Sequence, residues 1–455
     1  AGAAAAAGAA LLLSSGDAFS AEKTVAPGQS VQSVIAAAAE GDIVRVPAGL
    51  YKERIVINKR IRLTGEPGAV IDGGGEGTLV DIRANGTELR GLTFRNGGST
   101  YSREDAGIRI EKANDVTIAD CRIEDTLFGI FAVEANRCLI EGTTVIGKDL
   151  PHVRRGDGVR LWYSNGCVLR KNTVERSRDV IIWYSADTVV EENLVRTSRY
   201  GLHYMYSDKN VFHRNRFEDN QVGATIMYSH GVELTENAFS FSNGIAAYGL
   251  LVKDADDIFI ERNRFVGNAT ALFFDNAPQS KGARVTVHQN LIARNDVGLA
   301  LQPLSRRIEI WENSFIGNGT QVQIAGTGTA EANVWAVGGR GNYWSDAFTY
   351  DRDGDGVSEI PYRLESTYES LADRYPALTF FQGSPGADAI DSAARLFPIF
   401  APRPKMTDPA PLRRPVLNTW TERGEDSAGS GMLALGGFMI AASAGVVALG
   451  RRALA

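Results

Sequence analysis

The chain has 455 residues, a formal net charge of −6 and 22% charged residues. This length allows a large core, and the absence of a basic stripe interleaved with aromatic residues disfavours a nucleic-acid partner. Its three Cys exclude a disulfide framework, and its 49 Gly are too few for a collagen-like chain.

The first 21 residues form an apolar segment typical of a secretory signal. Ala1–Leu13 is rich in Ala, and the small residues in Ala18–Ala21 could support cleavage. A poorly ordered Ala-rich arm is the alternative. We therefore predict a signal-peptide remnant over residues 1–21 and an exported protein.

An N-terminal cap is predicted over residues 22–54. Ser30 is a suitable N-cap for a short amphipathic helix over Val31–Glu40, and Gly41 follows it. A first strand and turn are expected over Ile43–Tyr51. A repeat fold must cover the apolar end of its core, and this helix is suited to that position.

Residues 55–340 carry a repeat of about 22 residues. Seven Asn mark this repeat at separations of 21, 22, 22, 26, 27 and 23 residues: Asn172, Asn193, Asn215, Asn237, Asn263, Asn290 and Asn313. Apolar residues alternate with polar ones before each Asn, which indicates short strands with one buried face. Stacked Asn side chains can form amide ladders. The repeat predicts an all-β solenoid, a parallel β-helix with loop insertions in its longer coils.

A second periodic feature is a column of four large side chains, each followed by Tyr-Ser: Trp162, Trp183, Met205 and Met227. Residues that share a phase stack at the strand spacing of about 4.8 Å. Alternation places His203 and Met205 on one face of their strand, with Met227 beside Met205 in the next coil. One imidazole and two thioethers suit Cu(I). Core packing is the alternative, because Met and Trp are common in interiors.

Two more residues belong to the predicted copper site. The indole of Trp183 would cover the ion through its π face, and His230, three residues beyond Met227, would serve as an exchange ligand. Neutral ligands give reversible binding, which suits transfer of the ion. We expect His213 and His288, each two residues before an Asn, to be solvated surface residues.

The three Cys fall on buried columns of the repeat. Cys138 and Cys167 share one column in adjacent coils, where they could form a disulfide or act as small core residues. Cys121 takes the place of Asn in the ladder.

A capping tail is predicted over residues 341–400. Asp351, Asp353 and Asp355 have the spacing of the first half of a Ca²⁺-binding loop, and Glu359 would be a further ligand. A regular EF-hand is excluded because Tyr362 stands where its last Glu belongs. A salt-bridged acidic turn is the alternative to Ca²⁺ binding.

A Pro-rich linker is predicted over residues 401–430 and a transmembrane anchor over residues 431–452. Met432–Gly450 is uncharged and just long enough to span a bilayer. Arg451 and Arg452 then predict the C-terminus inside and the solenoid outside. A processed sorting tail or a weak anchor is the alternative.

Three stretches resemble the NosD family: Gly201–Ser207, Tyr248–Asp254, and Gly341–Asp346 with the Asp/Gly-rich run that follows it. The resemblance covers roughly residues 25–415. It implies a right-handed β-helix in the periplasm that works with an ABC transporter, made of an ATPase and a membrane subunit. It also implies assembly of the copper–sulfur centre of nitrous oxide reductase, with copper arriving from a lipoprotein chaperone.

Carried over to this chain, the resemblance points to His203, Met205 and Met227 for copper, the residues already selected by their chemistry. Two other functions fit the same fold: a rigid adaptor that binds no metal, and an extracellular carbohydrate-binding or lyase-type enzyme. A lyase needs a base and charge-neutralising groups in one groove, and the outward column between Arg160 and Thr225 holds no carboxylate pair. We therefore predict a copper-handling accessory protein, not an enzyme.

Overall fold

The computed structural model describes residues 21–244, 247–325, 328–364, 368, 371–372, 375–381, 384–396 and 404–416. Except for Ala21, the predicted signal remnant lies outside these residues, as does the predicted transmembrane anchor. Within the described part of the chain, no helix is long and apolar enough to cross a bilayer.

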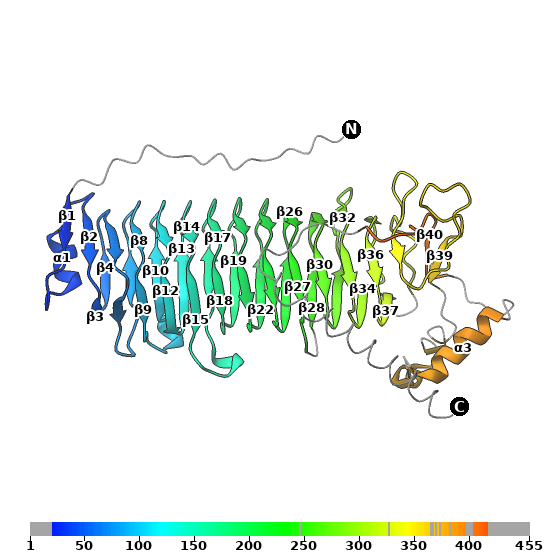
Figure 1. The fold of residues 1–455 in the computed structure, drawn as a ribbon, viewed down its shortest axis with the longest axis horizontal. Helices are drawn as coiled ribbons and strands as arrows, with labels where there is room; N and C mark the ends of the chain where they lie inside the picture. The colour runs from blue at the N-terminus through cyan, green and yellow to red at the C-terminus, as the bar shows by residue number, and fades with distance from the viewer. Residues whose placement is uncertain are drawn as a thin grey trace, which may run out of the picture. The chain divides into compact units, whose positions relative to one another are not determined.

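Three parallel sheets form a β-solenoid, to which a typical coil contributes one strand each (Figure 1). Sheet 1 has 13 strands: β1 (Glu22–Thr24), β2 (Ile43–Val46), β5 (Arg62–Gly65), β8 (Glu88–Arg90), β11 (Thr117–Ala119), β14 (Leu139–Glu141), β17 (Val168–Arg170), β20 (Val189–Glu191), β23 (Val211–His213), β26 (His230–Thr235), β29 (Asp256–Glu261), β32 (Val285–His288) and β35 (Ile308–Trp311). The all-β parallel β-helix predicted from the repeat is confirmed.

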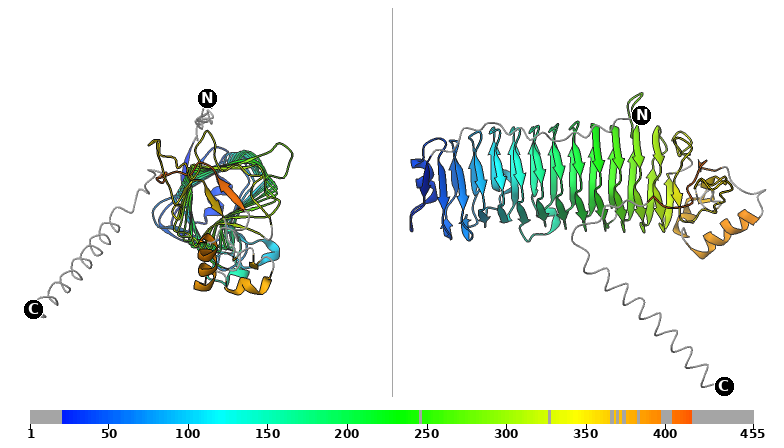
Figure 2. Two further views of the ribbon diagram at one scale, coloured as in Figure 1. Left: turned by 90° about the vertical axis from the view of Figure 1, so that its right-hand side faces the viewer. Right: turned by 45° about the horizontal axis from the view of Figure 1, so that its top comes forward.

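Sheet 2 has 12 strands: β4 (Ile55–Ile57), β7 (Val80–Ile82), β10 (Ala106–Glu111), β13 (Phe128–Val133), β16 (Val159–Trp162), β19 (Asp179–Trp183), β22 (Tyr200–Met205), β25 (Val222–Met227), β28 (Tyr248–Lys253), β31 (Thr270–Asp275), β34 (Val297–Leu301) and β37 (Thr320–Ile324). Sheet 3 has 13 strands: β3 (Gly49–Lys52), β6 (Ala69–Asp72), β9 (Thr93–Arg95), β12 (Arg122–Thr126), β15 (Thr144–Gly147), β18 (Thr173–Glu175), β21 (Leu194–Arg196), β24 (Arg216–Glu218), β27 (Ala238–Ser240), β30 (Arg264–Val266), β33 (Leu291–Ala293), β36 (Ser314–Ile316) and β38 (Tyr343–Trp344). Figure 2 shows the strands of successive coils stacked one on another.

The interior of the solenoid is filled by every second residue of each strand. In β22, Leu202 and Tyr204 are fully buried, while His203 and Met205 between and beside them are partly exposed. Like residues stack along the core: the rings of Phe217 and Phe239, from adjacent coils, are 5.1 Å apart. Burying one such side chain contributes about 2 kcal/mol, so each coil adds its own layer of stability.

Buried amide ladders join the coils at two corners. In the ladder that the sequence predicts, Asn215 Nδ2 donates to Val190 O (2.7 Å) and to Asn237 Oδ1 (3.0 Å). The ladder runs one coil beyond the predicted set, because the Asn313 backbone N–H donates to Asn342 Oδ1 (3.1 Å). The second ladder includes three further Asn in successive coils: Asn268, Asn295 and Asn318. These bonds satisfy backbone groups that the tight corners would otherwise bury unpaired.

The Tyr-Ser repeats have a structural cause at the third corner. Each Tyr adopts a left-handed backbone conformation, with φ of 51° at Tyr163 and 52° at Tyr228. The following Ser is buried and its hydroxyl accepts a backbone N–H of the preceding coil, from Ser185 to Ser207 at 2.9 Å and from Ala135 to Ser164 at 3.0 Å. Four Ser form this ladder: Ser164, Ser185, Ser207 and Ser229.

The N-terminal end is covered by helix α1 (Val31–Ala37), whose N-cap is Ser30. The helix is shorter than predicted because Ala38 turns into an extended conformation. The carboxylate of Glu53 accepts the Val31 N–H at 2.8 Å, a cap that sequence reasoning missed. Parallel pairing already begins at β1 and β2, so the coils start before the predicted boundary at residue 55.

The C-terminal end of the core is covered by residues that sequence analysis placed in a linker. Strand β40 (Met406–Asp408) pairs with β39 (Tyr362–Leu364), and Met406 is fully buried. The buried Asp408 accepts the Asn342 N–H (2.7 Å) and the Trp344 indole N–H (2.9 Å). An open solenoid end exposes apolar side chains and unpaired groups, and residues 404–416 cover them. Beyond β39 the described residues also form η3 (Pro376–Phe381) and α3 (Pro385–Leu396).

Replacing one ladder residue should destabilise the fold. In Asn237→Ala, the buried Asn215 N–H and Phe212 carbonyl lose their partners, which should lower the free energy of unfolding by about 3 kcal/mol. Asn243→Ala is the matched control, because Asn243 is exposed and, among the described residues, its side chain donates only to Phe241 O. Urea unfolding followed by circular dichroism measures both. Equal stability of the two variants would contradict the ladder's role.

Candidate metal-binding surface on sheet 2

Four large side chains stack on the outward face of sheet 2. Trp162 is paired in register with Trp183, Trp183 with Met205, and Met205 with Met227. All four are partly exposed, while the residues before them in their strands are buried. We call this outward face of β16, β19, β22 and β25 the wall. The side chains lie where the alternation in the sequence predicts.

His203 lies on the wall two residues before Met205, with 17% of its side chain exposed. Its ring meets Trp183 edge to face, with centroids 5.0 Å apart and an interplanar angle of 89°. Tyr200 packs against the same ring in a tilted arrangement, with centroids 4.9 Å apart and an interplanar angle of 35°. The structure therefore brings one imidazole and the two thioethers, Met205 and Met227, to one face. Met side chains have three rotatable bonds, so both sulfurs can turn toward one ion.

A buried carboxylate that sequence analysis missed lies against His203. Asp179 is fully buried, and its Oδ2 is 3.3 Å from His203 Nδ1. Arg199 donates to both carboxylate oxygens. Burial alone would raise the pKa of Asp179, but the hydrogen bonds from His203 and Arg199 outweigh it and lower the pKa. Asp179 is therefore ionised at neutral pH.

Period-two counting fails to relate these two residues because the register shifts between β19 and β22. Asp179 pairs with Tyr200, whereas Ile181 pairs with His203, so one strand has an extra residue between the pairs. Only the recurrence of Asp at positions 157 and 179, at or just before the start of a strand of sheet 2, marked the site in the sequence.

Trp183 lies beside Met205, on the side away from Met227. Its ring packs against Trp162 at 5.6 Å and against His203, and it is the register neighbour of Met205. The indole N–H is buried and meets no hydrogen-bond acceptor among the described residues.

Arg160 closes the N-terminal end of the wall. Its guanidinium donates to Glu104 (3.0 Å), forms an ion pair with Asp157 (2.7 Å) and lies 5.6 Å from the centre of the Trp162 ring. Asp157 is fully buried, and burial raises its pKa to about 6 despite the ion pair. Asp157 and Asp179 thus occupy neighbouring coils but have pKa values shifted in opposite directions.

A strip of four stacked Tyr rings borders the wall: Tyr163, Tyr184, Tyr206 and Tyr228. Successive ring centres are 4.7, 5.1 and 5.0 Å apart, with interplanar angles of 8°, 5° and 11°. Their left-handed backbone holds the rings side by side at the corner after sheet 2. The wall therefore continues into a flat aromatic strip.

His230, predicted as an exchange ligand, begins β26 in sheet 1 and is 60% exposed. Its Nδ1 is 3.5 Å from Asp208 and its Nε2 is 3.4 Å from Asp256. Both ring nitrogens therefore face carboxylates in this structure.

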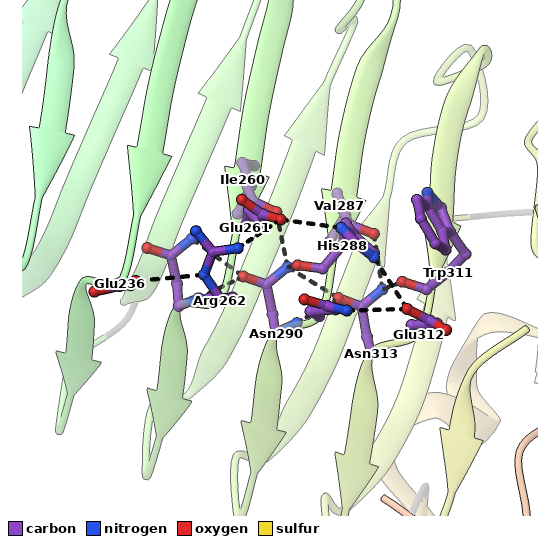
Figure 3. Close-up of polar contacts among 12 residues, drawn as sticks. Glu236, Ile260, Glu261, Arg262, Val287, His288, Asn290, Trp311, Glu312 and Asn313 are labelled. Carbon is purple, nitrogen blue, oxygen red and sulfur yellow. Dashed lines mark hydrogen bonds and ion pairs between the residues drawn. The ribbon is translucent and has the colours of Figure 1, made fainter. Parts of the chain in front are cut away.

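His288 is not the solvated surface residue that we predicted. Only 12% of its side chain is exposed, and its two ring nitrogens lie 3.3 Å from Glu261 and 3.2 Å from Glu312 (Figure 3). Its ring stacks on Trp311 at 3.6 Å. Neighbouring coils thus cover an outward position with long side chains. Arg262 extends the network by pairing with Glu261 at 2.9 Å.

The acidic loop in the C-terminal tail brings three of its four predicted ligands together. Carboxylate oxygens of Asp351, Asp353 and Glu359 lie within 4.8 Å of one another. Asp355 instead accepts the backbone N–H of Val357 at 2.8 Å. A guanidinium nitrogen of Arg413 lies 3.4 Å from Asp351 and partly balances its charge.

All three Cys are free and buried, so Cys138 and Cys167 are not bridged. Burial raises the pKa of Cys121 to about 12. Hydrogen bonding with Cys167 and burial raise the pKa of Cys138. Thiolates are the form that binds metal, so Cys121 and Cys138 are poor soft ligands, whereas a thioether needs no deprotonation.

Comparison with known proteins gives consistent relatives. Residues 138–348 match the family model NosD, described as a periplasmic copper-binding protein. A protein from Stutzerimonas stutzeri named probable ABC transporter binding protein NosD is 30% identical over an alignment of 410 residues, which covers 84% of this chain and 89% of that protein. A protein of the same name from Pseudomonas aeruginosa is 29% identical over an alignment of 392 residues, which covers 81% of this chain and 87% of that protein.

Solved structures share the fold. The A-module of mannuronan C-5 epimerase AlgE6 from Azotobacter vinelandii superposes with a TM-score of 0.55 at 18% identity, covering 68% of this chain and 94% of that module. The catalytic unit of a GH87 α-1,3-glucanase from Streptomyces thermodiastaticus gives a TM-score of 0.52 at 15% identity, covering 70% and 66%. At such identities the likeness concerns the fold alone.

Asp157 should make the protein less stable as pH rises. Because the pKa of Asp157 is raised to about 6 in the folded state, the folded protein binds the proton more tightly than the unfolded chain, and stability falls as pH rises from about 4 to about 6. Asp157→Asn removes this loss. As the pH rises from about 4 to about 7, the free energy of unfolding of the variant should therefore rise relative to that of the wild type by up to about 3 kcal/mol.

Asp179→Asn is the matched control with the opposite sign. The pKa of Asp179 is lowered, so its contribution is present at neutral pH and is lost as pH falls below about 4. Urea unfolding at several pH values measures both variants. The same pH dependence in both would contradict the assignment.

Proposed function

Because the chain belongs to the NosD family, we propose that it binds Cu(I) on the wall, at His203, Met205 and Met227, and passes the ion to a partner protein. The observation that carries this proposal is the register of β22 and β25. It sets Met205 beside Met227 on an outward face, with His203 two residues before Met205.

The chemistry of these donors favours the reduced ion. Thioethers are soft ligands that select Cu(I), and imidazole suits copper. All three donors are neutral, so the bound ion keeps its positive charge and is held by coordination alone. An indole face attracts a cation, and Trp183 lies next to both Met205 and His203. Such a site binds the ion reversibly, as transfer requires.

The wider role that we propose is maturation of the copper–sulfur centre of nitrous oxide reductase in the periplasm. The proposed partners are the ATPase and membrane subunits of an ABC transporter, the reductase, and a lipoprotein that supplies copper. Support comes from the family description, periplasmic copper-binding protein, and from relatives named as probable ABC transporter binding proteins. The C-terminal membrane anchor remains a prediction.

The carbohydrate-enzyme alternative is less well supported by the wall. A lyase or epimerase must neutralise a substrate carboxylate with a free cation and remove a proton with a base. Two guanidiniums at the wall are already paired, Arg160 with Asp157 and Arg199 with Asp179. The other alternative, an adaptor that binds no metal, would have the same β-solenoid. Only a measurement of copper binding therefore separates it from the proposed function.

Loss of either thioether should weaken copper binding. Met205→Leu and Met227→Leu keep side-chain volume but remove sulfur, and each should raise the Kd for Cu(I) about tenfold or more, equivalent to about 1.4 kcal/mol. Competition with a chromophoric Cu(I) chelator measures the Kd. Met406→Leu is the matched control, because it removes a thioether buried in β40, away from the wall. Unchanged affinity in both wall variants would refute the site.

We also propose that Asp351, Asp353 and Glu359 bind Ca²⁺. Three carboxylates within 4.8 Å repel one another, and hard oxygen donors suit this ion. Ca²⁺ at about 100 times its Kd should stabilise the folded protein by about 2.7 kcal/mol. Thermal unfolding with Ca²⁺ or with a chelator measures the effect. Asp351→Asn should abolish it and Asp355→Asn should keep it, whereas no shift in the wild type would sink the proposal.

A further inference from the structure

The contact between Asp179 and His203 has a consequence for the copper site. Asp179 accepts hydrogen bonds from the Arg199 Nε–H at 2.9 Å and from the Tyr200 backbone N–H at 3.3 Å. Arg199 also donates to Oδ2, the oxygen that faces His203 Nδ1 at 3.3 Å. A carboxylate held in this way by three N–H donors acts as an acceptor. The hydrogen between Asp179 and the imidazole must therefore belong to His203 Nδ1.

We propose that Asp179 is a positioning residue, which holds the proton of neutral His203 on Nδ1 and so presents the lone pair of Nε2 to the copper ion. The hydrogen bond made by one ring nitrogen decides which nitrogen is free to bind metal. Carboxylates in this position are common behind metal-binding His, where they fix the tautomer and the ring orientation. The inference rests on the proposed function for the ion, but the tautomer is a property of the chain alone.

Two aromatic rings fix the plane of the imidazole. Trp183 meets it edge to face at 5.0 Å, and Tyr200 packs against it at 4.9 Å with a tilt of 35°. Rotation of the ring away from Asp179 would break both contacts. The carboxylate therefore sets the tautomer, while Trp183 and Tyr200 hold the orientation.

Arg199 compensates the negative charge of the buried Asp179 carboxylate. A buried charge without a partner costs several kcal/mol, and Arg199 offers two nitrogens to Asp179 from a partly exposed position. Its guanidinium also lies 4.7 Å from the centre of the Tyr200 ring. The contacts therefore run from Arg199 to Asp179 and from Asp179 to His203, whose ring lies on the wall.

Nuclear magnetic resonance of the ¹⁵N-labelled His rings tests the proposal directly, in the full chain at about pH 8, above the ordinary pKa of a free imidazole. The wild type should show His203 with its proton on Nδ1. In Asp179→Asn, His203 should shift toward the tautomer with its proton on Nε2, and the Kd for Cu(I) should rise about 10- to 100-fold. The matched control is Asp157→Asn, which removes a buried carboxylate in the preceding coil that pairs with Arg160 and should leave the His203 signals unchanged.

Each result decides one claim. A wild-type His203 with its proton on Nε2 overturns the inference, and this measurement needs no variant to fold. An unchanged tautomer in a folded Asp179→Asn variant overturns it as well. If the tautomer shifts as expected while the thioether variants bind copper like the wild type, the proposed copper site fails and the positioning role of Asp179 stands.

Discussion

Successive coils hydrogen-bond in parallel register, and the buried side chains at the corners repeat that register. Asn237 Oδ1 accepts a hydrogen bond from the backbone N–H of Asn215 in the coil before it, and Asn237 Nδ2 donates one to Asn263 Oδ1 in the coil after it. A slip of one residue would send every outward side chain of that strand inward. The ladders therefore do more than stabilise the rod, because they fix which side chains share a face and how far apart they lie.

The wall depends on this register. Met205 and Met227 are 22 positions apart in sequence but adjacent in space, and Trp183 flanks them from the coil before. Strands of a long, closely packed stack are rigid supports, and sites held by such elements keep their geometry. The fold itself imposes no chemistry, since carbohydrate-processing enzymes share it. The proposed function therefore depends on the side chains on one face of sheet 2, not on the fold.

Sequence alone was sufficient for the repeat and for the parity of the wall, because both follow from local period-two patterns. It was not sufficient for Asp179, because a register shift between β19 and β22 interrupts that count. It also assigned residues 404–416 to a linker on their Pro content, whereas the open end of the core decides that Met406 is buried. His288 was misjudged for a related reason: its cover comes from side chains of neighbouring coils, such as Trp311.

X-ray absorption spectroscopy at the copper edge, on protein loaded with one equivalent of Cu(I), tests the central claim most directly, because it identifies the atoms bound to the ion. We predict a reduced copper with one nitrogen and two sulfur neighbours, from His203, Met205 and Met227. A copper centre without sulfur neighbours would contradict this site. So would sulfur neighbours that persist after both Met205 and Met227 are replaced by Leu.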